Sequence, residues 1–163
     1  MTEELMIKRL AVWLDKGKFP YQVPRCFMYG WECDFWCMTD GGITREFEIK
    51  ISRSDFLIDK KKQKHADTTR GANYFYYVCP PNLISKTEVG RYGLIYISED
   101  RLTVEKKPSK LHSFKFTNWQ MLANKMYWKW YSVWWDKLKA KEITNDEWRA
   151  GFNIDIESEA IFG

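Results

Sequence analysis

Two stretches of alternating polar and apolar residues, joined by a glycine turn, constrain the fold of this chain more than any other feature. Residues 31–36 (Trp-Glu-Cys-Asp-Phe-Trp) and 45–52 (Arg-Glu-Phe-Glu-Ile-Lys-Ile-Ser) alternate with a period of two, the pattern of half-buried strands. Asp-Gly-Gly at positions 40–42 lies between them and predicts a hairpin. With a three-residue loop at 40–42, paired positions sum to 82, and Asp34 lies opposite Glu48.

This register places charged side chains together on one face of the hairpin. Directly opposed residues have Cβ atoms about 4.5–5.5 Å apart, so Asp34 and Glu48 would repel each other. A divalent cation gives a reason for the pairing, because proteins hold Mg²⁺ with one or two carboxylates, substrate phosphate oxygens and water. Lys50 lies on the same face, and the carbonyl of Ile49 offers a backbone oxygen. The alternative is a solvated sheet face that carries ordinary charges.

A cation held by Asp34, Glu48 and the Ile49 carbonyl suits phosphodiester hydrolysis, since it would activate water and neutralise the phosphoryl oxygens. The ammonium of Lys50 would orient the attacking water and stabilise developing negative charge. Lys50 could act as a base only if burial lowers its pKa. The sequence therefore predicts three catalytic residues, Asp34, Glu48 and Lys50.

Composition is that of a globular protein with a basic body. The 163 residues carry a net charge of +4, but residues 142–163 hold six acids and one base, so residues 1–141 carry +9. We expect one domain over 1–141 and an acidic extension over 142–163. A basic body suits contact with a polyanion, although an ordinary basic surface has the same composition. Apolar runs are short and no CxxC motif is present, so we expect no membrane span, reduced cysteines and a cytoplasmic location.

The expected secondary structure is a mixed α/β arrangement in the order α-β-β-β-α-β, with helices packed on the sheet. Thr2 caps the first helix and Gly17 ends it. Two prolines limit the first strand to a short edge strand. The expected ranges are helix 2–15, strand 19–25, the hairpin, helix 55–67, strands 73–79, 93–97 and 102–105, a long helix 117–141 and a short helix from 144.

A basic segment follows the second hairpin strand. Ser52 and Arg53 come first, and Lys60, Lys61 and Lys64 come closest to sharing one face of the expected helix 55–67. Lysines and arginines in such a position contact phosphates and give affinity without sequence information. The alternative is a solvated, charged helix face.

The long helix is unusually aromatic. Trp128, Tyr131 and Trp135 fall away from its apolar stripe and could stack on unpaired bases. They could equally cover a sheet edge or seal a dimer, and packing is the favoured interpretation.

The run Phe47-Glu48-Ile49-Lys50-Ile51-Ser52-Arg53-Ser54-Asp55-Phe56 resembles the (D/E)XK element of the PD-(D/E)XK nuclease superfamily, with Asp34 as the first acid. The similarity extends from about Tyr29 to Pro108 and is greatest to the MmcB-like DNA-repair branch. It implies a restriction-endonuclease-like αβββαβ core with a mixed sheet, to which the aromatic helix is an addition. It also implies DNA cleavage dependent on Mg²⁺ or Mn²⁺. Many members add a glutamate from the first helix, for which Glu4 or Glu3 is the candidate here. The proline that usually precedes the first acid is replaced by Cys33.

The predicted function is a metal-dependent DNA endonuclease acting in repair, recombination or DNA processing, encoded by a bacterium or phage. DNA is the expected partner, and a homodimer is expected if cleavage is structure-selective. One rival is a non-catalytic nucleic-acid-binding module of the same fold. Another is a phage protein that captures a host component through the tryptophan-rich helix.

Overall fold

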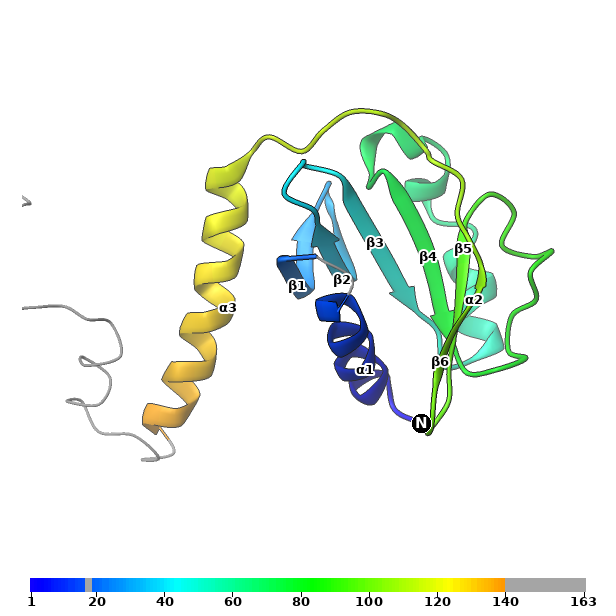
Figure 1. Cartoon of the computed structure of the whole chain (residues 1–163), viewed down its shortest axis with the longest axis horizontal. Coiled ribbons are helices and arrows are strands. Elements are labelled where there is room, and N and C mark those ends of the chain that lie inside the picture. The colour runs from blue at the N-terminus through cyan, green and yellow to red at the C-terminus, as the bar shows by residue number, and fades with distance from the viewer. Residues whose placement is uncertain (17–18, 140–163) are drawn as a thin grey trace, which may run out of the picture. The chain divides into compact units, whose positions relative to one another are not determined.

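The computed structural model describes residues 1–16 and 19–139 (Figure 1). The chain divides into two compact units, Met1–Trp119 and a second that begins at Gln120. The expected boundary at 141/142, the end of the first helix at Gly17, the acidic extension and the helix expected from 144 lie outside the described residues. The elements are α1 (Glu3–Lys16), β1 (Tyr21–Met28), β2 (Trp31–Met38), β3 (Thr44–Ile49), α2 (Arg53–Asp59), η1 (Gln63–His65), η2 (Thr68–Arg70), β4 (Tyr74–Cys79), β5 (Gly93–Ile97), β6 (Leu102–Lys106) and α3 (Trp119–Lys139).

The six strands form one mixed sheet in the order β1-β2-β3-β4-β5-β6. β1, β2 and β3 are antiparallel, β3, β4 and β5 are parallel, and β6 returns antiparallel to β5. The connection from β3 to β4 passes through α2, as a parallel pair requires. The predicted α/β class and the order α-β-β-β-α-β are confirmed.

The predicted hairpin register is also confirmed. Phe35 pairs with Phe47 and Met38 with Thr44, so paired positions sum to 82. The Thr39 N–H donates to the Ile43 carbonyl (3.0 Å) and closes a three-residue loop. Within that loop Gly42 has φ +78°, a conformation that favours glycine.

Helices pack on opposite faces of the sheet. Met6, Leu10 and Leu14 of α1 pack against Phe35 and Phe47 on one face. The other face carries the side chains that alternate with these, and there Phe56 of α2 packs on Tyr77 of β4 (ring centroids 5.0 Å apart). Thr2 caps α1 as predicted, since its hydroxyl accepts from the Leu5 N–H (3.3 Å). Both faces of the central strands are therefore covered (Figure 1).

Two element lengths differ from the sequence-based expectation. β1 has eight residues, although it is an edge strand as expected, and it accommodates Pro24 in its middle. α2 ends at Asp59 rather than extending to residue 67, and two short 3₁₀ turns follow it. Lys62 adopts an extended conformation (φ −69°, ψ 146°) that leaves the helix. The chain thereby turns Lys64 and His65 back toward the sheet, so tertiary contacts override the helical preference of this segment.

The aromatic helix α3 is confirmed as an element and begins at Trp119, two residues later than predicted. Along it, Tyr127 stacks on Tyr131 (5.9 Å between centroids, 25° between planes), and Tyr131 stacks on Trp135 (6.1 Å, 12°). This spacing of four residues brings rings together on one side of the helix. Across the described ranges, none of the helices has the length and apolar character needed to cross a membrane.

Candidate active site

Asp34 lies where β2 separates from β3. The β2–β3 pairing ends at Phe35 and Phe47, and one residue further Asp34 Oδ2 accepts a hydrogen bond from the backbone N–H of Ile49 (2.7 Å). Asp34 is on the same face as Glu48, because each is two residues from the Trp36–Glu46 pair. Burial and the nearby charge of Glu48 raise the pKa of Asp34 to about 6. The two carboxylates are therefore close enough to repel, as the register predicted.

Both oxygens of Glu48 contact lysine ammonium groups. Lys50 Nζ donates to Oε1 (2.8 Å) and Lys64 Nζ donates to Oε2 (2.6 Å). All three side chains are almost completely buried, with exposures of 3–6%. Charge-assisted hydrogen bonds of this kind compensate for the loss of hydration that buried charges suffer. Glu48 and Lys50 thus meet as predicted, and Lys64 joins them.

Asp59, the last residue of α2, is a second buried carboxylate in the same cluster. Its Oδ2 accepts from the Tyr77 hydroxyl (2.9 Å) and lies 3.0 Å from His65 Nε2. Its Oδ1 lies 2.9 Å from Lys62 Nζ and 3.3 Å from Lys64 Nζ, although neither ammonium is aimed at it as a hydrogen-bond donor. Burial alone would raise the pKa of Asp59, but the hydrogen bond with His65 and the charge of Lys64 hold it well below its ordinary value.

Sequence reasoning missed Asp59 as a site residue and placed it early in a longer helix. No sequence signal identified it, because the expected helix continued to residue 67. In the structure Asp59 ends α2, where the helix dipole disfavours negative charge. Such a residue needs compensating cations, and Lys62 and Lys64 supply them.

Glu46 is a third buried carboxylate of this cluster. Its Oε1 accepts from the indole N–H of Trp31 (3.0 Å) and lies 3.8 Å from Lys64 Nζ. Burial raises the pKa of Glu46 to about 7, although Lys64 and Trp31 oppose this. The pKa of Glu46 is therefore near neutral pH, whereas the neighbouring Glu48 carboxylate is ion-paired through both of its oxygens.

Lys50 is held as a cation. Burial disfavours its ammonium, but the charges of Glu48, Asp59 and Asp55 outweigh this and raise the pKa of Lys50. Asp55 Oδ1 and Asp59 Oδ1 lie 3.4 and 3.7 Å from its Nζ. Of the two roles considered for Lys50, that of a charged donor is supported by this environment, and that of a base is not.

The residues predicted to contact DNA do not share one helix face. Ser52 caps α2, where its hydroxyl accepts from the Asp55 N–H (3.2 Å). Arg53 pairs with Glu88 (2.8 Å), and Lys60 donates to the Glu88 carbonyl (3.2 Å). Lys61 is exposed.

The prediction that Lys64 shares a surface with Lys60 and Lys61 is wrong. The helix ends before Lys64, whose ammonium is buried against Glu48. The cation that the sequence assigned to the DNA surface is therefore part of the carboxylate cluster.

The acids of α1 differ in their relation to Asp34. Glu4 pairs with Lys8 on the helix surface (3.0 Å). Glu3 pairs with Arg25 (3.3 Å), and the neighbouring pairs of the β1–β2 ladder place Arg25 opposite Asp34. Glu3 is also among the charges that raise the pKa of Asp34, after burial and Glu48. The helix acid near the site is Glu3, rather than Glu4.

The side chains at this site offer a hard divalent cation two carboxylates, those of Asp34 and Glu48. In residues 1–16 and 19–139, no three His, Cys, Asp or Glu side chains are grouped as a metal site of protein ligands requires. Asp34 and Glu48 would therefore hold an ion together with the Ile49 carbonyl and water, a protein ligand set of the size that Mg²⁺ uses. An ion would relieve the repulsion from Glu48, which raises the pKa of Asp34 together with the larger effect of burial. It would also compete with Lys64 for Glu48.

Comparison with solved structures finds a protein of similar fold. The fold is similar to that of the SPO1766 protein of unknown function from Silicibacter pomeroyi, with a TM-score of 0.60 and 17% sequence identity. The similarity covers 89% of this chain and 97% of that protein. No family model matches the sequence, and no curated protein is similar to it. The comparison supports the α/β fold.

Proposed function

We propose that this protein is a DNA endonuclease of the PD-(D/E)XK type, dependent on Mg²⁺ or Mn²⁺ and acting in repair, recombination or DNA processing in the cytoplasm. The supporting observation is the position of Asp34, Glu48 and Lys50 on one side of the sheet, where β2 and β3 separate. The fold has the element order expected for such an enzyme.

Asp34, Glu48 and the backbone carbonyl of Ile49 would hold the cation. When bound, the ion supplies a water of lowered pKa and neutralises charge on the phosphoryl oxygens. Asp34 is suited to this because, among residues 1–16 and 19–139, no cation forms an ion pair with its carboxylate, and because burial penalises its charge. The Ile49 N–H fixes the orientation of the Asp34 carboxylate through Oδ2 (2.7 Å).

Lys50 provides the positive charge next to the reacting phosphate. It stays protonated because Glu48, Asp59 and Asp55 raise its pKa, so it acts as a hydrogen-bond donor. A fixed ammonium at this place stabilises the negative charge that develops on the phosphoryl oxygens. Asp59 is a positioning residue, since it lies 3.7 Å from Lys50 Nζ and is itself held by Tyr77 and His65.

Exposed cations beyond the site would hold the DNA backbone. Lys60, Lys61 and Lys62 follow α2 in sequence and are all exposed. Contacts from lysines to phosphates are independent of base sequence and weaken as salt increases. The proposal therefore includes binding that is salt-dependent and unselective for sequence.

Cleavage assays test the proposal directly. Supercoiled and branched DNA would be incubated with the protein and Mg²⁺ or Mn²⁺, alongside Asp34→Ala, Lys50→Ala and the surface control Glu4→Gln. We expect nicking by the wild type and by Glu4→Gln, and none by the other two variants. Binding without cutting by the wild-type protein in either metal would contradict the proposal.

A non-catalytic nucleic-acid-binding module is the second candidate, and one observation favours it. The ammonium of Lys64 lies 2.6 Å from Glu48 Oε2, so a cation already compensates the carboxylate that would hold the metal. Such a module would bind DNA equally in chelator and in Mg²⁺. Divalent-dependent binding that is lost in Asp34→Asn would favour the nuclease instead.

A further inference from the structure

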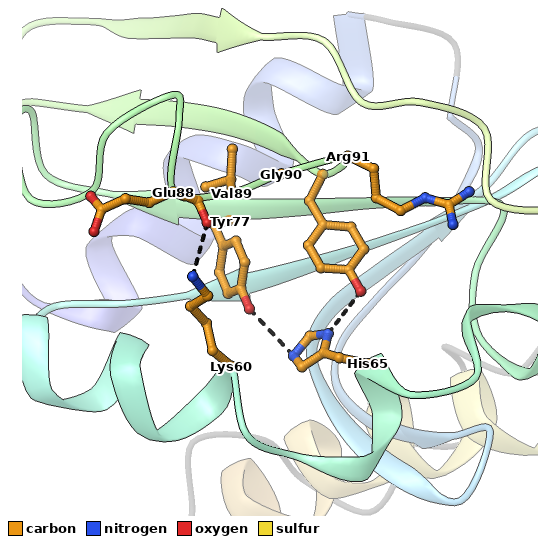
Figure 2. A pocket seen from close by; sticks show the side chains of 8 residues that line it. Lys60, His65, Tyr77, Glu88, Val89, Gly90 and Arg91 are labelled. Atoms are coloured by element: carbon orange, nitrogen blue, oxygen red, sulfur yellow. Dashed lines mark hydrogen bonds between the residues drawn. The ribbon is translucent and has the colours of Figure 1, made fainter.

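A separate pocket lies next to the carboxylate cluster and is lined by both aromatic and cationic side chains (Figure 2). Its volume is about 290 Å³, close to the lower limit of about 300 Å³ for typical ligand sites. It is formed by the residue that follows α2, by η1, by β4 and by the loop between β4 and β5. The lining residues are Lys60, His65, Tyr77, Glu88, Val89, Gly90, Arg91 and Tyr92.

The aromatic wall of the pocket is fixed in place by hydrogen bonds. His65 Nδ1 is 3.0 Å from the Tyr92 hydroxyl, and His65 Nε2 is 3.3 Å from the Tyr77 hydroxyl (Figure 2). Tyr92 also packs on Phe75, with ring centroids 4.7 Å apart. Because the Tyr92 ring is already ordered, a flat ligand ring that stacks on it would not have to order it first.

The charges around the pocket favour an anion. Lys60 and Arg91 line it, and Lys106 donates to the Gly90 carbonyl at its edge. The single acid of the lining, Glu88, is compensated from outside by Arg53 (2.8 Å). Hydrogen bonds from Arg53 and from the Ser85 N–H lower the pKa of Glu88 to about 2, so it remains an ion-paired anion.

The backbone of the loop is also preorganised. Lys60 Nζ donates to the Glu88 carbonyl (3.2 Å; Figure 2), and the Tyr92 N–H donates to the Val89 carbonyl (3.0 Å). The Arg53–Glu88 pair joins the loop to the first turn of α2. The cations and the rings are therefore presented by a constrained frame.

We propose that this pocket binds a single nucleotide, with the phosphate at Lys60, the base against the Tyr92 ring and the edge of the base toward Arg91, which lies at the opposite end of the pocket from Lys60 (Figure 2). Ammonium groups are usual partners of phosphate, and aromatic faces stack on any base. The size of the pocket limits the ligand to about one nucleotide. The pocket connects to the cluster through Asp59, which contacts both His65 and Tyr77. If the proposed nuclease function holds, the bound nucleotide is one unit of the DNA strand beside the cleaved bond.

Calorimetric titration with deoxyadenosine 5′-monophosphate, deoxyadenosine and inorganic phosphate tests this proposal. The titrations are made in chelator, so that binding is measured apart from any metal-dependent cleavage. We expect stoichiometric binding of the nucleotide, and affinity at least about tenfold weaker for the nucleoside and for phosphate. Equal affinity for phosphate or for the nucleoside would overturn the proposal, because one of the two groups would then not be recognised.

Variants locate the binding. Arg91→Ala and Lys60→Ala are exposed substitutions, and each should weaken nucleotide affinity about tenfold or more. Arg101→Ala is the matched control, since Arg101 lies in the β5–β6 turn. Tyr92→Phe keeps the ring and should keep most of the affinity. Binding unchanged in both Arg91→Ala and Lys60→Ala would place the nucleotide elsewhere and end the proposal.

The outcome is separable from that of the nuclease assay. Nucleotide binding in chelator by a protein that never cuts DNA would support the pocket and contradict the nuclease. Cleavage by a protein that does not bind nucleotides in chelator would do the reverse.

Discussion

At the point where the β2–β3 ladder ends, the side chain of Asp34, rather than the backbone of β2, accepts a hydrogen bond from the Ile49 N–H. The side chain thus bridges two separating strands and lies next to Glu48. This position has an electrostatic cost, since burial and Glu48 raise the pKa of Asp34 to about 6. The geometry that makes Asp34 a candidate ligand therefore also makes it unfavourable for folding when it is ionised.

The first prediction is that Asp34→Asn stabilises the protein at neutral pH. The pKa of Asp34 in the folded protein, about 6, is above its ordinary 3.8, so its contribution to stability is full below about pH 4 and is lost as pH rises through 6. Asn keeps an acceptor for Ile49 and has no charge. Urea unfolding should show a gain of about 2–3 kcal/mol at pH 8 and almost none at pH 4. A difference that does not change with pH would contradict this explanation.

The second prediction concerns Lys50→Met. Loss of this buried cation leaves Glu48 and Asp59 less compensated, so we expect a loss of about 2–4 kcal/mol in the free energy of unfolding. If the proposed nuclease function holds, cleavage of supercoiled DNA by the folded variant should fall by about 10²–10³. Lys61→Met is the control, because Lys61 is exposed and should change stability by less than about 0.5 kcal/mol.

A double variant separates charge from packing in that result. In Lys50→Met combined with Glu48→Gln, both members of the pair are neutral, so part of the lost stability should return. If the two losses simply add, the pair contributes no coupling and the interpretation of Lys50 as the counter-ion of Glu48 is wrong.

The third prediction is that Lys64 competes with a divalent cation for Glu48. Lys64→Met removes the ammonium from Oε2, so the affinity for Mn²⁺ should rise about tenfold, measured by calorimetry. Without metal the variant should be less stable by about 2–4 kcal/mol, and millimolar Mn²⁺ should restore part of this. An unchanged Mn²⁺ affinity in the folded variant would show that the ion, if any, is held elsewhere.

The fourth prediction distinguishes two neighbouring acids of α1. Glu3 is one of the charges that raise the pKa of Asp34, whereas Glu4 pairs with Lys8. Glu3→Gln should lower the pKa of Asp34, measured from the pH dependence of its carboxyl carbon resonance, and Glu4→Gln should leave it unchanged. A larger effect from Glu4 would reinstate it as the helix acid of the site.

The hairpin and its two carboxylates could be predicted because the information is local. A period of two fixes which side chains share a face, and the Asp-Gly-Gly turn fixes the register. Lys50 follows Glu48 by two residues and needs no further information. Lys50 therefore contacts Glu48, and Asp34 lies on the same face of the sheet as Glu48, as the sequence implied.

The roles of Asp59 and Lys64 could not be predicted because they depend on contacts distant in sequence. Lys64 contacts Glu48 across sixteen residues, and Tyr77 contacts Asp59 across eighteen. A helical pattern extended through residue 67 places Lys64 on the surface, whereas the structure buries its ammonium against Glu48 and Asp59. Lysines that follow a (D/E)XK element can therefore either contact phosphates or neutralise buried carboxylates, and the sequence does not distinguish the two roles.

The edge strand β1 has a consequence for how copies of this protein can associate. Pro24 carries no N–H, and Arg25 has φ 44°, so the outer side of the strand is not a continuous extended template. The hydrogen bonds between this edge and a strand from another molecule would be interrupted at Pro24 and Arg25. If the expected homodimer forms, we therefore expect its subunits to meet through side chains, rather than by extending the sheet beyond β1.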